Sequence, residues 1–89
     1  MSLEIFDQFD MLFEKRSASA RYEGNLCVVN LVGGNKLRRY LRNGRTEWLE
    51  VVFPEPDSAS MLITRGRMFN QGDIEVLCAI LHENMHRGF

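Results

Sequence analysis

The sequence predicts a small α+β domain, with a helix at each end and a mostly antiparallel sheet of about four strands between them. Residues 3 to 15 carry apolar side chains at helical spacing, and residues 74 to 85 do so again. Between them, residues 26 to 53 alternate apolar and polar side chains around two turn signals. With 89 residues, 45% hydrophobic and 26% charged, the whole chain (residues 1–89) is expected to form one domain.

The first helix is expected to be amphipathic. Its apolar residues fall within an arc of roughly 120° when successive residues are placed 100° apart, and they are Ile5, Phe6, Phe9, Leu12 and Phe13. Such a helix must bury three phenylalanines. Only one face of the predicted sheet offers enough apolar surface, so both helices are expected to cover that same face.

The sheet is expected to be a meander. Gly33-Gly34-Asn35 and Asn43-Gly44 are turn signals that separate three strands, and Pro54 ends the third of them. Met61 to Thr64 forms a short fourth strand.

The strand register is predicted from the separation of polar from apolar residues. The best separation pairs Val32 with Lys36 and Arg42 with Thr46, which requires a three-residue loop rather than a two-residue one at Asn43-Gly44. The buried face then holds Cys27, Val29, Leu31, Leu37, Leu41, Leu49, Val51 and Phe53. The other face holds Val28, Asn30, Arg38, Tyr40, Arg42, Trp48 and Glu50.

Two features of this segment leave alternatives open. Arg39 falls on the apolar face, so it must lie near an edge or find a carboxylate. Leu37, Tyr40 and Leu41 also fit one face of a short helix. The sequence does not decide between strand and helix for residues 36–42.

The last helix has two apolar flanks. Its main stripe is Ile74, Leu77, Cys78, Leu81 and Met85, and Val76 and Ile80 form a second. Asn70 or Asp73 is the expected N-cap. A terminal helix that is apolar on two sides either lies deep in the core or meets a partner subunit. Together with five methionines, this pattern predicts a homodimer.

Composition argues against some partners and compartments. The net charge of −1 gives no general attraction to nucleic acid or to an anionic membrane, and no apolar run is long enough to cross a bilayer. Cys27 and Cys78 lie in apolar runs and are expected to be buried free thiols. A secreted domain of this size usually has more cysteines, so a cytoplasmic location is expected.

His82-Glu83-Asn84-Met85-His86 matches H-E-x-x-H, in which two histidines on one helix face share a zinc ion and the glutamate acts as general base. A catalytic zinc needs a third protein ligand, and the chain has no other histidine. Cys78 cannot join the pair, because residues at i, i+4 and i+8 of a straight helix span about 12 Å. Cys27 or an acidic residue on a loop is the remaining candidate for a third ligand. A solvated histidine pair is the favoured interpretation, and His82 and His86 as metal ligands of a zinc hydrolase are the alternative.

The second candidate site is the polar sheet face, where Arg38, Tyr40, Arg42 and Trp48 are predicted to lie together. Aromatic and arginine side chains are enriched in the residues that dominate protein–protein binding. They also stack on bases and contact phosphates, so the basic segment Lys36–Arg45 is an alternative nucleic-acid site. The same side chains in cross-strand pairs would simply stabilise an exposed sheet.

We therefore expect a non-catalytic cytoplasmic binding or regulatory module that acts through protein–protein contacts and needs no cofactor. Templates for phosphate binding and nucleophilic catalysis are missing from the sequence. The alternatives are nucleic-acid binding and, third, zinc-dependent hydrolysis.

Overall fold

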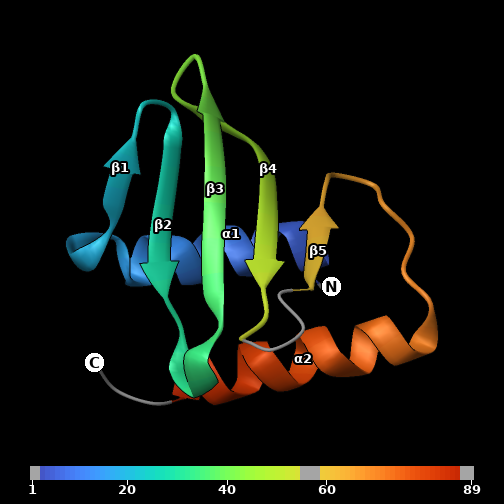
Figure 1. The fold of residues 1–89 in the computed structure, drawn as a ribbon. Coiled ribbons are helices and arrows are strands. Elements are labelled where there is room, and N and C mark those ends of the chain that lie inside the picture. Colours follow the sequence, from blue (N-terminus) through green and yellow to red (C-terminus); the bar gives the residue numbers. More distant parts are fainter. Residues whose placement is uncertain (1–2, 55–58, 87–89) are drawn as a thin grey trace.

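The computed structural model describes residues 3–54 and 59–86, in which two α-helices accompany a five-stranded antiparallel sheet (Figure 1). The strands follow one another in chain order across the sheet. The elements are α1 (Ile5–Lys15), η1 (Ser17–Ser19), β1 (Arg21–Glu23), β2 (Leu26–Asn30), η2 (Val32–Gly34), β3 (Lys36–Arg42), β4 (Arg45–Val52), β5 (Ser60–Ile63) and α2 (Gln71–His86). The predicted α+β fold is confirmed, and residues 36–42 form a strand.

The sheet has one strand more than the expected four. The additional strand, β1, is three residues long and exposed throughout, so it carries no alternating pattern that a sequence could reveal. It joins β2 through a two-residue turn, Gly24-Asn25, in which Gly24 has a φ of +63°. A glycine adopts that backbone conformation without the steric cost that other residues have.

The predicted pairing of β2 with β3 is wrong by two residues. Asn30, rather than Val32, lies opposite Lys36, because Val32 belongs to the 3₁₀ turn η2. Leu31 closes this turn by donating its N–H to the Asn35 carbonyl oxygen at 2.8 Å. A shift of two residues leaves every side chain on its predicted face, since the side-chain repeat of a strand is two.

The β3–β4 hairpin has a two-residue loop, yet its aromatic residues keep the register that a three-residue loop would give. Tyr40 lies opposite Trp48, as predicted. Beyond it the register shifts between Tyr40 and Leu41, so that Arg42 faces Arg45 across a two-residue Asn43-Gly44 turn. The prediction of a three-residue loop with Arg42 opposite Thr46 is therefore wrong. A β-bulge absorbs the extra residue instead and preserves the pairing of the aromatic residues.

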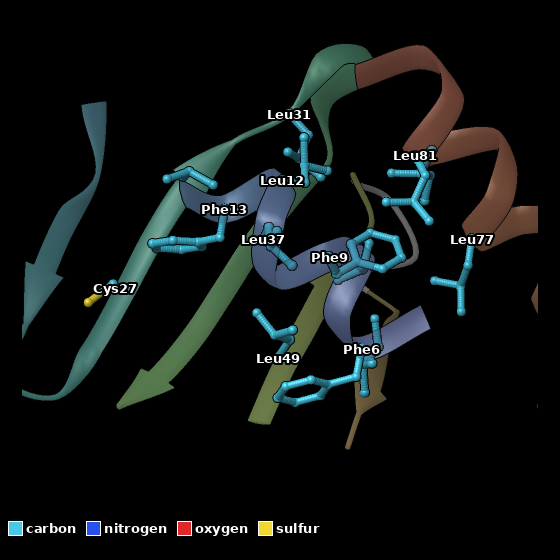
Figure 2. Close-up of a cluster of buried hydrophobic side chains, with 14 residues drawn as sticks. Phe6, Phe9, Leu12, Phe13, Cys27, Leu31, Leu37, Leu49, Leu77 and Leu81 are labelled. Atoms are coloured by element: carbon cyan, nitrogen blue, oxygen red, sulfur yellow. The ribbon is translucent and has the colours of Figure 1, made fainter. Parts of the chain in front are cut away.

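The core lies between one sheet face and the two helices (Figure 2). Figure 1 shows α1 behind the strands, and α2 packs against α1 and against η2 at one end of the sheet. The buried apolar residues come from both helices, the strands and the β2–β3 connection, and they are Phe6, Phe9, Leu12, Phe13, Cys27, Val29, Leu31, Leu37, Leu49, Val51, Ile63, Leu77, Ile80 and Leu81. Burying three phenylalanines requires the apolar face of the sheet, as the sequence indicated.

Arg39 is the charged residue on this buried face, and it lies in the central strand with 8% of its surface exposed. Its guanidinium donates to the carboxylates of Asp10, at 3.1 Å, and Glu14, and lies 4.2 Å from the centre of the Phe13 ring. Burial lowers the pKa of Arg39, but its hydrogen bonds to Glu14 and Asp10 and their charges outweigh burial, and the pKa is raised. Of the two alternatives, a position near an edge or a carboxylate partner, the structure shows the carboxylate partner.

α2 is rotated relative to the predicted stripe. Its fully buried side chains are Leu77 and Asn84, with Ile80 and Leu81 nearly so, whereas Cys78 is exposed. The expectation of a buried Cys78 was wrong, because the buried side of the helix runs through Leu77, Ile80, Leu81 and Asn84 and leaves Cys78 outside it. The N-terminus is capped as expected, by Asn70 Oδ1, which accepts the Asp73 N–H at 2.8 Å. Within the part of the chain that is described, neither helix is long and apolar enough to span a bilayer.

Candidate functional site

The sheet face turned away from the core carries the predicted aromatic pair. We call it the open face and define it by Leu26, Val28, Arg38, Tyr40, Trp48, Glu50, Val52 and Leu62. Tyr40 and Trp48, directly opposite each other on β3 and β4, stack with ring centroids 5.4 Å apart and an interplanar angle of 5°. Both are half-buried. The central strands therefore hold a flat aromatic platform outside the core.

Arg38 lies beside this platform. Its guanidinium pairs with Glu50, directly opposite on β4, and lies 5.9 Å from the centre of the Trp48 ring. That distance is within the range of a cation–π interaction. The guanidinium is thus fixed on two sides while 34% of the side chain stays exposed. A fixed but accessible guanidinium loses little conformational freedom when it meets a ligand.

Arg42 lies at the far end of β3, beyond the bulge. It donates to Glu47, which the bulge places next to it, at 3.1 Å. Both side chains are well exposed, at 70% for Arg42 and 40% for Glu47, so this pair contributes little to stability. The structure thus brings Arg38, Tyr40 and Trp48 together and leaves Arg42 at the rim.

Apolar side chains continue the open face on both sides of the aromatic pair. Leu26 lies opposite Tyr40 on β2, and Val28 lies opposite Arg38. On the other side Leu62 of β5 lies opposite Glu50 and is 43% exposed. An apolar and aromatic centre with ion pairs around it resembles the composition of protein–protein interfaces.

The basic segment Lys36–Arg45 is divided between the two faces of the sheet. Arg39 points to the opposite face, toward Asp10 and Glu14. Arg38 and Arg42 already have carboxylate partners. A phosphate at this segment would therefore compete with carboxylates for both guanidinium groups.

The two histidines of H-E-x-x-H lie on the exposed side of α2, with ring centroids 4.6 Å apart. They border a shallow hollow lined also by Gln8, Cys78, Leu81 and Met85. Among residues 3–54 and 59–86, no group of three possible metal ligands is assembled. The spacing brings His82 and His86 together, as the sequence predicted.

Asn84, between these histidines, is the residue that sequence reasoning missed. Its side chain is fully buried and accepts the Val32 N–H at 2.8 Å while donating to the Ile80 carbonyl oxygen at 2.9 Å. The Asn84 carbonyl oxygen accepts from Arg16 at 3.1 Å. This residue thus links α2 to η2 and to the end of α1. The only signal in the sequence is its position, four residues after Ile80, on the buried side of the helix.

Comparisons of the chain with protein-family models, with curated proteins and with solved structures found no match in any of the three. The open face is therefore the feature of the molecule that bears on function.

Proposed function

We propose that this protein is a non-catalytic binding module that recognises a protein partner through the open face of its sheet. The observation that carries the proposal is the Tyr40–Trp48 stack, which lies on the face opposite the core. A side chain as apolar as tryptophan gains more from burial than almost any other, and here its burial in the monomer is partial. A partner that covers the open face would complete it.

The surroundings of the stack favour a protein partner. Glu50 and Glu47 balance the charges of Arg38 and Arg42, and Lys36, opposite Val52, adds one further cation to this side of the sheet, so its excess of positive charge is small. Nucleic-acid binding depends chiefly on cations that neutralise phosphates, and its strength falls steeply with salt. An aromatic centre with paired charges at its border fits the arrangement of hot spots in protein interfaces.

Self-association and location belong to the same proposal. We infer a homodimer, and a reducing cytoplasm as its compartment. Cys27 and Cys78 are both free thiols, whereas small secreted domains generally depend on disulfides.

Quantitative affinity capture from extracts of the cells that make the protein tests the partner face. Tagged wild type is compared with Trp48→Ala and Arg38→Ala, and Met68→Ala serves as the matched control, because Met68 is 90% exposed and lies outside the open face. Proteins that bind the open face are retained by wild type and by the control and lost by both other variants. Retention of every captured protein by Trp48→Ala and Arg38→Ala would refute the proposal.

Two further measurements separate the alternatives. Short RNA and DNA oligonucleotides are titrated at low and at moderate salt, with the fluorescence of Trp48 as readout. We expect no saturable change, and saturable binding that weakens with salt would favour nucleic acid instead. Elemental analysis of the purified protein, with His82→Ala as comparison, addresses zinc: a stoichiometric metal that this substitution removes would contradict the proposed non-catalytic role.

A further inference from the structure

The two edges of the sheet differ in how their backbone groups are satisfied. β1 and β5 are the edge strands. At β5 the Leu62 carbonyl oxygen accepts a hydrogen bond from the guanidinium of Arg67, a residue of the same chain. A carbonyl that already accepts a hydrogen bond protects an edge against the addition of another strand. The β5 edge is therefore protected by its own chain.

The β1 edge shows no such protection among the described residues. In a two-residue hairpin the pair that flanks the turn, here Glu23 and Leu26, exchanges hydrogen bonds, and the next pair, Tyr22 and Cys27, does not. The N–H and carbonyl of Tyr22 consequently point away from β2, toward the outside of the sheet. The Tyr22 side chain is 64% exposed.

The sequence of this edge is complementary to itself. When two antiparallel copies of Arg21-Tyr22-Glu23 pair about Tyr22, Tyr22 faces Tyr22, and each Arg21 faces a Glu23 of the other copy. The two tyrosines exchange two backbone hydrogen bonds, and the flanking residues form the close, non-hydrogen-bonded pairs in which side chains approach most. Opposite charges in such pairs are favourable.

We propose that a second copy of this chain docks antiparallel on β1, which joins two sheets into one continuous ten-stranded sheet. Arg21 and Glu23 have neutral neighbours on β2, Val28 and Leu26, and neither belongs to an ion pair of the described chain. Their charges are thus available for a partner, and the partner that fits them is an identical strand. The two open faces become neighbours on one side of the joined sheet.

The β1 edge is a better candidate for the homodimer interface than α2. Of the second apolar flank of α2, Ile80 is buried in the core and only Val76 stays exposed, at 43%. The contact at β1 is short, because the Ala20 N–H already donates to Ser17 and cannot extend the ladder. A contact of this size gives a weak dimer that depends on protein concentration.

Charge exchange tests the pairing directly. Sedimentation equilibrium from about 10 µM to about 1 mM covers the range of weak association. The wild type is expected to approach twice the monomer mass at the upper end. Arg21→Glu places like charges opposite each other twice and should weaken dimerisation by about tenfold. The double variant Arg21→Glu with Glu23→Arg restores opposite charges and should dimerise as the wild type does.

A second measurement locates the interface without any substitution. Backbone amide NMR shifts that depend on protein concentration are expected at residues 21–23 and not along α2. The variant Tyr22→Pro lacks the outward N–H, so it should remain monomeric. A cooperative thermal unfolding transition of this variant would show that it is still folded. A chain that is monomeric throughout, a double variant that fails to recover, or shifts confined to α2 would each overturn the inference. This inference rests on the homodimer of the proposed function and not on partner binding by the open face. A failure of the capture experiment would therefore leave the β1 dimer standing, and the loss of the β1 dimer would leave partner binding standing.

Discussion

Replacing Asn84 by alanine is expected to destabilise the protein more than any substitution on its surface. The change removes the acceptor of the Val32 N–H, at 2.8 Å, and the donor to the Ile80 carbonyl, at 2.9 Å. An orphaned buried donor costs about 1–3 kcal/mol. Because Val32 is half-buried, the cost of leaving its N–H unpaired lies near the lower end of this range. Truncation of the fully buried Asn84 side chain adds the cost of a small cavity. Together these effects reduce the free energy of unfolding by about 2–3 kcal/mol.

Urea unfolding followed by circular dichroism measures this loss. For a domain of this size, 1 kcal/mol corresponds to about 4–8 °C in the unfolding midpoint, so thermal scans should show a fall of roughly 10–20 °C. Asn30→Ala is the matched control, because Asn30 is an exposed asparagine at the end of β2, and its cost should stay within about 0.5 kcal/mol. Equal stabilities of the two variants would refute the assignment of Asn84 as the link between α2 and η2.

Two further predictions concern the turn glycines and the cysteines. Gly44→Ala should lower the free energy of unfolding by about 1 kcal/mol, because Gly44 has a φ of +77°. Gly72→Ala, in the first turn of α2 with an ordinary φ, should instead raise it by about 0.4–1 kcal/mol. Chemical denaturation measures both changes, and effects of the same sign would contradict the backbone geometry. A thiol reagent should label Cys78 in the native protein and Cys27 only after unfolding, as mass spectrometry of the labelled peptides would show, and rapid native labelling of Cys27 would contradict the core.

The periodicity of the sequence was enough to predict the faces of the sheet and the amphipathic first helix. Leu37, Leu49 and Val51 are buried, and Tyr40 pairs with Trp48, because alternation specifies the face of each residue wherever one side of a sheet is buried. Arg39 was recognised as an exception that would have to lie near an edge or find a carboxylate. The structure identifies the partners as Asp10 and Glu14. Their identity depends on how α1 crosses the sheet, which the alternation along a strand does not reveal.

The misses share a physical cause, which is that tertiary contacts override local patterns. β1 is too short and too polar to be seen, and it exists because the Gly24-Asn25 turn folds it back on β2. Asn84 looks like a surface residue, yet its partner Val32 lies 52 residues earlier in the chain. For the candidate site, the sequence predicted the aromatic pair, but the bulge that leaves Arg42 at the rim is visible only in the structure.

The central claim is that the sheet has one face in the core and one face, carrying Trp48, open to a partner. Trp48 is the only tryptophan of the chain, so acrylamide quenching of its fluorescence in the native protein reports on this face alone. We predict substantial quenching before unfolding, because the indole is only partly buried, and stronger quenching in Tyr40→Ala, because loss of the stacked ring exposes one face of the indole. Emission that resists acrylamide until the protein unfolds would mean that the indole lies in the interior, and the open face would not exist.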